Sequence, residues 1–308
     1  MRLFFIKTIL MLCAHLPLTV IHGLGVLIGW GLIMVPNRIL DNTKTNVRLC
    51  FPELPPAEQH RLVCKSLTET GKTISETSAL WFRPGPEALQ LIRSVDGLGL
   101  VENAIKKGNG VILATPHLGA WEAAGLYGAA MFNMTCLYRP LRITELEDLV
   151  RTARNRLGAN YVPTTAIGIR RVYKALGQGG IVAMLPDQEP QSGTGTFAPF
   201  FGIPAWTMVL LARLTAKTGA PIIFAYCERL AWGRGYRLHF SAAPAGIYSS
   251  DTNTAATAIN QAIEQLIRNC PTQYQWSYRR FRTRPTGESS FYKPGHHQDL
   301  SLPHQPER

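Results

Sequence analysis

Two kinds of segment alternate along residues 108–270, and their order limits the folds that this chain can adopt. Five apolar runs have the length and composition of strands: GNGVILATPH (108–117), MTCLYRP (134–140), IVAMLPDQ (181–188), APIIFAYCER (220–229) and YRLHFSAAP (236–244). Five segments have helical character: EAAGLYGAAMF (122–132), ITELEDLVRTARNRLG (143–158), AIGIRRVYKALGQGG (166–180), WTMVLLARLTAKTG (206–219) and NTAATAINQAIEQLIRNC (253–270). Such alternation predicts an α/β fold with a mixed, largely parallel sheet sandwiched by helices.

An uncharged apolar segment precedes this region. From Thr8 to Asn37 the chain contains no Lys, Arg, Asp or Glu. As a helix, residues 9–35 would be about 40 Å long, enough to cross a hydrocarbon core of about 30 Å. A buried core helix is one alternative. A cleaved signal peptide is another, but the run is too long and no small-residue cleavage site follows it. We expect residues 1–37 to be a hydrophobic membrane helix, spanning the bilayer or lying in its interface.

The remaining chain divides by composition. We expect residues 38–285 to form one domain, with a helix that begins at the Pro55-Pro56 pair. Residues 286–308 are polar and contain Pro and His, so we expect a disordered tail. The fraction of hydrophobic residues, 46%, with only 17% charged residues, excludes global disorder.

Charge and cysteine usage narrow the class of protein further. Lys and Arg number 32 against 20 Asp and Glu, a formal net charge of +12, which favours polyanionic partners such as anionic lipid, nucleic acid, a phosphorylated substrate or an acidic protein. The six cysteines are scattered without C-x-x-C spacing, which argues against a disulfide framework or a zinc site. Free cysteines fit a reducing compartment, so we expect the main domain in the cytoplasm.

His117 is the strongest candidate for a catalytic residue. Only His60, His117 and His239 lie between the apolar segment and the tail, and His117 alone follows a buried strand and opens a turn into a helix. The carboxyl ends of strands are where α/β folds place ligands and catalysts. Glu122, five residues on, is expected to hold one ring nitrogen while the other faces substrate. With no G-x-S-x-G motif, the nucleophile would be a substrate hydroxyl. The alternative is a capping or core histidine beside an unrelated solvated glutamate.

The H-L-G-A-W-E segment (117–122) resembles the H-x4-[D/E] block of glycerolipid-type acyltransferases, and more narrowly the late acyltransferases of bacterial lipid A biosynthesis. Further blocks agree in order: LYRP (137–140), R-x-R (154–156), LPDQ (185–188), FAPFFGIPAW (197–206) and WSYRRFRTRP (276–285). The resemblance covers roughly residues 1–285. Ala120 departs from the Asn frequent in the family, and the Pro-Glu-Gly-Thr block of phosphatidic-acid-type enzymes is absent, which argues against lysophosphatidate as acceptor.

The resemblance implies roles for several polar residues. Asp187 and Gln188 follow a buried strand at the sheet edge that also carries His117. Gln188 is expected to donate to an acceptor ester or amide, and Asp187 to orient an arginine or a sugar hydroxyl, or else only to form a turn. Arg139 and Arg156 are expected to pair with substrate phosphate or the carrier's phosphopantetheine. Solvated surface charges are the alternative for both arginines.

Aromatic residues support a lipid substrate in the same way. Phe200 and Phe201 are expected to line an acyl-chain groove, or else simply to pack. The basic and aromatic run 276–284 resembles a nucleic-acid stripe, but a membrane interface suits it better because an apolar anchor lies at the other terminus. No nucleic-acid-binding motif accompanies it.

The resemblance implies an acyltransferase of lipid A biosynthesis. His117 would act as general base on a hydroxyl of an acyl chain carried by a lipid A precursor, and the donor would be acyl-acyl carrier protein, with no metal, other cofactor or covalent intermediate. Expected partners are acyl carrier protein, a phosphorylated glycolipid acceptor and anionic lipids of the bacterial inner membrane, with the catalytic domain on the cytoplasmic face. Alternatives are transfer to another lipid acceptor, such as an ornithine lipid or glycolipid, or a membrane-anchored lipid-binding protein without catalysis.

Overall fold

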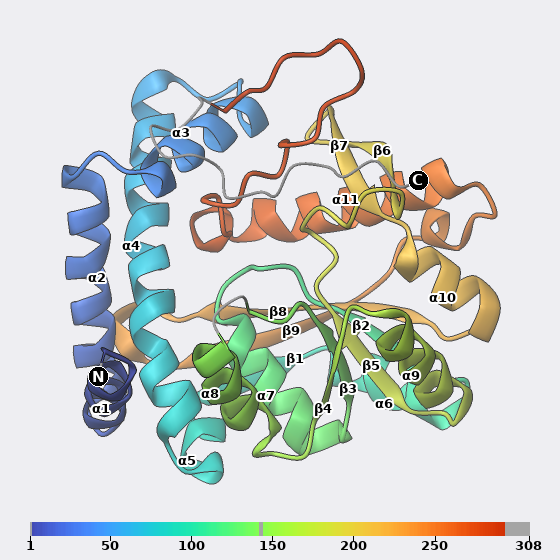
Figure 1. The fold of residues 1–308 in the computed structure, drawn as a ribbon, viewed down its shortest axis with the longest axis horizontal. Helices are drawn as coiled ribbons and strands as arrows, with labels where there is room; N and C mark the ends of the chain where they lie inside the picture. The colour runs from blue at the N-terminus through green and yellow to red at the C-terminus, as the bar shows by residue number, and fades with distance from the viewer. Residues whose placement is uncertain (1, 142–143, 293–308) are drawn as a thin grey trace.

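The computed structural model describes residues 2–141 and 144–292, whose centre is a seven-stranded sheet (Figure 1). Its strands are β1 (Ile92–Asp96), β2 (Val111–Ala114), β3 (Thr135–Tyr138), β4 (Asn160–Pro163), β5 (Ile181–Met184), β8 (Ile222–Arg229) and β9 (Tyr236–Ala242), in the order β1-β9-β8-β2-β5-β3-β4. The five strands from β8 to β4 are mutually parallel, whereas β9 is antiparallel to β8 and carries β1 parallel to itself. The predicted mixed, largely parallel sheet is confirmed.

Helices cover both faces of the sheet, because successive side chains of its central strands point to opposite sides. In β2, Val111 and Leu113 join a hydrophobic core with α6 (Leu98–Lys106) and α7 (Trp121–Phe132). Ile112 and Ala114 join a second core, beneath α9 (Ala166–Gly177), α10 (Leu210–Thr218) and α11 (Thr252–Asn269). The all-apolar strand thus reflects burial on both faces. The remaining helices are α1 (Arg2–Ala14), α2 (Leu18–Met34), α3 (Arg38–Cys50), α4 (Pro56–Phe82), α5 (Gly85–Leu89) and α8 (Thr144–Asn155).

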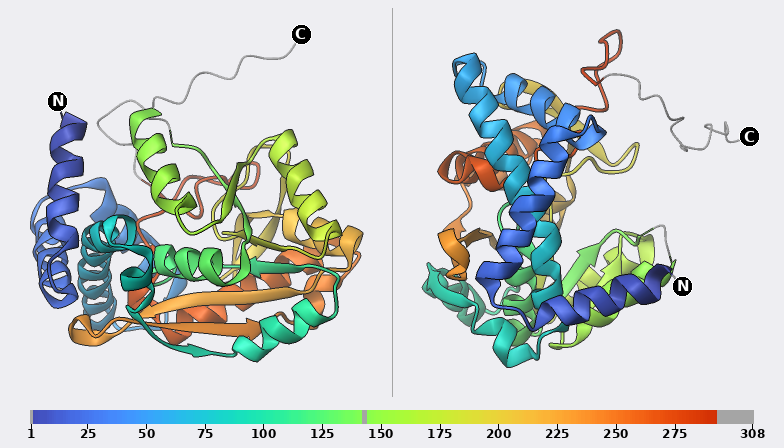
Figure 2. Two further views of the ribbon diagram at one scale, coloured as in Figure 1. Left: turned by 90° about the horizontal axis from the view of Figure 1, so that it is seen from below. Right: turned by 90° about the vertical axis from the view of Figure 1, so that its left-hand side faces the viewer.

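The predicted N-terminal helix is two helices. The chain turns between α1 and α2 at residues 15–17, where Pro17 is the N-cap of α2. Figure 2 shows α2 lying along α4 at one side of the molecule, with α1 set at an angle to it. No single helix of the described residues is long and apolar enough to span a membrane; α2 and α3 meet the length and composition criteria only together, and they are bent by 84°. Helix α4 begins at Pro56, as predicted.

A two-stranded hairpin stands apart from the main sheet and was not predicted. It pairs β6 (Gly195–Phe200) with β7 (Ile203–Met208). Residues 206–208, which were expected to be helical, belong to β7, and α10 begins only at Leu210. Pro199 and Pro204 face each other across the hairpin, and the prolines hid its strand pattern because proline cannot donate a ladder hydrogen bond.

Three residues of the C-terminal aromatic and basic run, Trp276, Arg280 and Phe281, are buried and so do not face a membrane surface as predicted, whereas Arg282 is exposed. Trp276 and Phe281 are fully buried in the core beneath α11. The Arg280 guanidinium donates to the Trp206 carbonyl and to the Thr207 hydroxyl, so it holds the hairpin against the domain. Residues 286–290 are exposed, but the chain returns to the core at Tyr292, which lies inside the expected tail; residues 293–308 of that tail lie outside the described residues.

Candidate active site

A sharp turn between β2 and α7 presents His117. Gly119 has φ +65°, and a Cβ there would lie 2.0 Å from the Cys227 carbonyl oxygen, so the turn requires glycine. Backbone hydrogen bonds fix the turn, from Ala120 N–H to the Cys227 carbonyl and from Gly119 N–H to the Gln273 carbonyl. His117 therefore sits at the carboxyl end of a central strand, as the sequence predicts.

Asp187 holds the backbone and the ring of His117. Its Oδ2 accepts the His117 N–H at 2.9 Å, and its Oδ1 lies 2.8 Å from His117 Nδ1. This contact forms because β2 and β5 are adjacent, so that their carboxyl ends meet at one edge of the sheet. Burial of Asp187 raises the pKa of its carboxyl, but the His117 charge and the hydrogen bonds from His117 outweigh burial and hold the pKa below its usual value.

The contacts define the ring tautomer of His117. Because the Asp187 carboxylate only accepts hydrogen bonds, Nδ1 carries the hydrogen and Nε2 keeps a lone pair. The Gln188 amide nitrogen lies 3.2 Å from Nε2 and 3.3 Å from the Gln275 side-chain oxygen, and it donates to both. In its neutral form the His117 ring thus presents an unprotonated nitrogen, the form needed by a general base.

The structure corrects the expected partner of His117, because Glu122 binds elsewhere. The Arg154 guanidinium binds both carboxylate oxygens of Glu122, and the Trp81 indole N–H donates to Oε2 at 3.1 Å. Burial raises the pKa of Glu122, but Arg154 and its hydrogen bonds lower it below the usual value. Glu122 is therefore an ionised residue that orients Arg154. The position expected for Glu122, at Nδ1 of His117, is occupied by Asp187.

A cavity of about 590 Å³ opens beside His117 and runs beneath α7. One wall is formed by residues spaced three or four apart on one face of α7, namely Trp121, Ala124, Gly125, Gly128 and Phe132. The opposite wall consists of apolar side chains of the sheet, namely Leu113, Cys136, Ala183, Ala225, Leu238 and Phe240. The walls formed by α7 and the sheet are mostly apolar, and His117 lies in the same lining, so the cavity suits a long apolar chain whose reactive end lies at the histidine.

The structure separates the expected substrate-binding arginines. Arg139 is exposed at the end of β3 and lines the cavity with His117, Glu122 and Gln188. Arg156 does not line it. Its guanidinium donates to the carbonyls of Leu80, Trp81 and Arg83 at the end of α4, where it satisfies carbonyls that lack helical partners.

The expected acyl-groove residues Phe200 and Phe201 do not line the cavity either. Phe200 is fully buried, and its ring centroid lies 5.0 Å from that of Phe201 and 6.0 Å from that of Phe281. The ring centroid of Phe201 lies 5.3 Å from that of Phe51 in the same core. The alternative role, packing, is the one the structure gives to both.

Sequence reasoning missed Arg154 as a site residue. Arg154 lines the cavity, and the R-x-R block of the resemblance contained it, but the expectation fell on Arg156. Arg154 lies in the last turn of α8, whereas Arg156 follows the end of that helix and turns to the end of α4, so only Arg154 reaches the cavity. Among the described residues, no group of three or more His, Cys, Asp or Glu side chains is placed to hold a metal ion.

Comparison with known proteins gives a consistent result over nearly the whole described chain. The family model for bacterial lipid A biosynthesis acyltransferases matches residues 2–283. The lipid A biosynthesis palmitoleoyltransferase of Escherichia coli is 31% identical over 288 residues, 92% of each chain. The lauroyltransferase of the same organism is 28% identical over 289 residues, also 92% of each chain. Its myristoyltransferase is 25% identical over 251 residues, 80% of this chain and 76% of that protein.

The family match agrees with the sequence blocks that suggested it and with a histidine beside a long apolar cavity. The chain is an acyltransferase and belongs to the bacterial lipid A biosynthesis acyltransferase family.

Proposed function

We propose that this enzyme transfers a fatty acyl chain from acyl-acyl carrier protein to a hydroxyl of an acyl chain on a lipid A precursor. The observation that carries the proposal is the His117 ring, held at Nδ1 by Asp187 and lying in the wall of a largely apolar cavity. The similar enzymes of Escherichia coli are named for lipid A and for different fatty acyl groups, which supports this acceptor class and an acyl donor.

His117 starts the reaction as general base. The acceptor hydroxyl takes the place of the Gln188 amide at Nε2 and gives its proton to the ring. The alcohol oxygen attacks the thioester carbonyl, and the C–O bond forms as the carbonyl becomes an oxyanion. The Asp187 carboxylate stabilises the imidazolium, which then protonates the thiolate as the C–S bond breaks. Atoms and charge balance without a covalent acyl-enzyme.

Arg154 supplies positive charge beside the reacting carbonyl. Its guanidinium lines the same cavity as His117, and Glu122 fixes its orientation by binding it through both carboxylate oxygens. A cation preorganised in this way stabilises an oxyanion with little rearrangement during the reaction. Glu122 therefore acts through Arg154, as a positioning residue.

The expected partners follow from charge. Exposed Arg139 and Arg213 line the outer part of the cavity, where phosphate groups of the acceptor or of the carrier's phosphopantetheine would meet them. The net charge of +12 favours an acidic carrier protein and anionic lipid. We place the enzyme at the cytoplasmic face of the bacterial inner membrane, where both substrates are within reach.

The direct test uses a defined lipid A precursor with free hydroxyls on its acyl chains. Incubation with the purified enzyme and a mixture of acyl-acyl carrier proteins is expected to increase the mass of the precursor by one acyl group. The same mixture without precursor, and a precursor whose hydroxyls are blocked, serve as controls. Transfer to an ornithine lipid or glycolipid in preference to the precursor would contradict the proposed acceptor.

The cavity beneath α7 predicts where acyl-chain length is set. A Cβ at Gly128 would lie 2.6 Å from the Met134 sulfur, and both residues line the cavity beyond the His117 end. Gly128→Ala is expected to push the flexible Met134 side chain into the cavity and shift the preferred donor towards shorter chains, by about tenfold in relative kcat/KM for a loss of two buried methylene groups. Met134→Ala is expected to shift it towards longer chains.

Competition between donors of different length measures this shift. Gly177→Ala is the matched control, because a Cβ there has open space and Gly177 lies on α9, outside the cavity lining. Equal slowing with all donors by Gly128→Ala, without change of preference, would show that the acyl chain lies elsewhere.

A further inference from the structure

Helix α2 has its apolar surface facing outward. Leu18, Ile21, Gly25 and Gly29 are buried against the protein, as is His22, the only ionisable side chain of the helix. The outward face carries large apolar side chains, namely Val20, Leu24, Leu27, Ile28, Trp30 and Met34. A helix that faces water shows the reverse distribution, so the outer face of α2 is suited to an apolar surrounding.

The inner face of α2 is fixed to α4 by backbone contact. A Cβ at Gly25 would lie 2.5 Å from the Lys72 Cα, and one at Gly29 would lie 2.4 Å from the Thr68 Cα. A Cβ at Gly71 of α4 would in turn lie 2.0 Å from the Gly25 carbonyl oxygen. Glycine at these positions lets the two helices lie in contact along their length, as Figure 2 shows.

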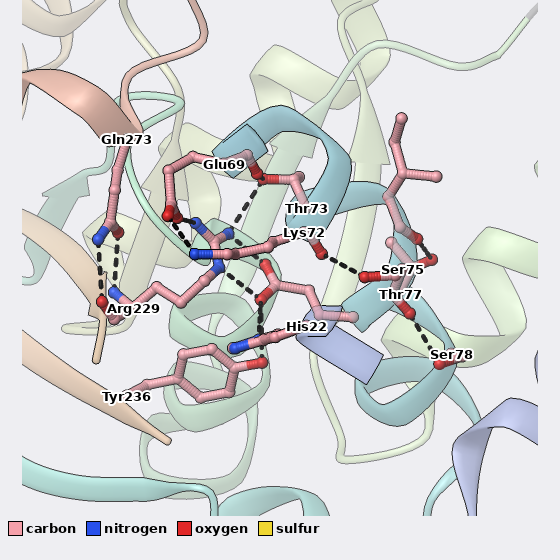
Figure 3. Close-up of polar contacts among 12 residues, drawn as sticks. His22, Glu69, Lys72, Thr73, Ser75, Thr77, Ser78, Arg229, Tyr236 and Gln273 are labelled. Carbon is pink, nitrogen blue, oxygen red and sulfur yellow. Dashed lines mark hydrogen bonds and ion pairs between the residues drawn. The ribbon is translucent and has the colours of Figure 1, made fainter. Parts of the chain in front are cut away.

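A buried polar cluster adds a second attachment (Figure 3). His22 Nε2 lies 3.3 Å from Glu76 Oε2 of α4, and both side chains are almost fully buried. Glu76 is bound in turn by the Arg229 guanidinium of β8, at 2.8 Å from Nε. Pulling α2 away from α4 would leave these polar groups without partners, which costs free energy.

Trp232 extends the apolar surface from a second element. It lies in the loop between β8 and β9, it is 84% exposed, and its φ of +60° is unfavourable for a side chain of this size. The loop is attached to the start of α2, because the Thr19 hydroxyl donates to the Trp232 carbonyl at 3.3 Å. Exposed Arg93 and Arg234 lie beside it, with Arg93 Nε donating to the Arg234 carbonyl.

We propose that the outer face of α2 and the Trp232 loop form one docking surface for a bilayer of anionic lipid, on which α2 lies along the interface, attached to α4, instead of crossing the membrane. Leucines would enter the hydrocarbon boundary, Trp232 would sit at headgroup depth, and the two arginines would meet lipid phosphates. The inference rests on the proposed action at a membrane, and it adds which surface meets the lipid and how α2 is oriented.

Flotation of the full chain with vesicles of phosphatidylethanolamine and phosphatidylglycerol tests the surface. Leu27→Asp and Trp232→Ser are each expected to lower the partition coefficient about tenfold or more. Ile167→Asp is the matched control, because Ile167 is 65% exposed against 66% for Leu27 but lies on α9, away from α2. Equal loss in the control, or no flotation of the parent, would overturn the proposal. So would a dimer that Leu27→Asp dissociates, which would assign the face to a second copy.

Labelling from one side of the membrane tests the orientation. In a chain whose half-buried Cys13, Cys64 and Cys270 are replaced by serine, His15→Cys and Met34→Cys place the accessible thiols just before α2 and at its end. With an impermeant maleimide, neither is expected to react in intact spheroplasts, and both are expected to react after lysis. Reaction of either one in intact spheroplasts would show a spanning helix and overturn the proposal. Acyl transfer in detergent micelles, expected unchanged in Leu27→Asp, measures the proposed function independently of docking.

Discussion

Asp187→Asn is expected to lower kcat by about 10²–10⁴-fold with little change in KM, because it reverses the tautomer of His117. The asparagine oxygen would still accept the His117 backbone N–H, which Asp187 Oδ2 accepts at 2.9 Å. Its amide group would then point at Nδ1 and donate to it, which moves the ring hydrogen to Nε2. A His117 ring protonated at Nε2 cannot take a proton from the acceptor hydroxyl. Steady-state transfer to a lipid A precursor measures both constants.

The controls separate positioning from folding. Asp148→Asn changes an exposed carboxylate on α8 that pairs with Arg151, and it is expected to leave kcat unchanged. His117→Ala is expected to reduce kcat at least as much as Asp187→Asn, and the double variant to be no worse than His117→Ala, because both changes remove one function. Near-normal kcat in Asp187→Asn would refute the assignment, and so would a fall in kcat matched by loss of folded protein.

The pairing of His117 with Asp187 illustrates the limit of the sequence analysis. Two strand ends carrying polar residues were recognisable at residues 114–117 and 184–188. Which ends are neighbours depends on the strand order, in which β5 lies next to β2 although β3 and β4 come between them in sequence. Glu122 is near in sequence, so local spacing favoured it, but as the second residue of α7 it binds Arg154.

Long-range packing explains the other differences. Phe200 and Phe201 lie in a block typical of the family, but the hairpin that carries them packs into the core beneath α11 and not beside His117. Arg280 looked like a surface cation because residues of basic runs usually are, and its burial depends on acceptors from distant parts of the chain, the Trp206 carbonyl and the Thr207 and Asn260 side chains. Strands and helices with long apolar periods, such as β2, β8 and α11, were predictable because local pattern and final burial agree.

The buried cluster around Arg229 predicts the largest effect on stability. Its guanidinium binds Glu76 through Nε and Nη2 and Glu69 through Nη1, while the Tyr236 hydroxyl donates to Glu76 at 3.0 Å (Figure 3). Burial raises the pKa of Glu76, but Arg229 and the hydrogen bonds outweigh it and lower the pKa from 4.5 to about 2. The carboxylate therefore depends on Arg229 for its charge inside the protein.

Arg229→Met is expected to lower the free energy of unfolding by about 3–5 kcal/mol, because it leaves Glu76 charged and buried without its cation. Arg237 lies on the exposed side of the neighbouring strand β9, so Arg237→Met is the matched control. It is expected to change the free energy of unfolding by about 0.5 kcal/mol or less. Adding Glu76→Gln to Arg229→Met is expected to restore part of the loss. Urea unfolding followed by circular dichroism measures the parent, these three variants and Glu76→Gln alone, and additive losses in the double variant would contradict the coupling.

The same pair predicts how stability depends on pH. Because the pKa of Glu76 is lower in the folded chain than its ordinary 4.5, the Glu76 contribution is fully present above about pH 4.5 and is lost as the pH falls towards about 2. The shift corresponds to about 3 kcal/mol. Glu76→Gln removes the titrating group, so its stability is expected to fall less steeply over this range than that of the parent. Parallel pH profiles would mean that Glu76 is not held ionised by Arg229, and the attachment of α2 through His22 would then lose its polar basis.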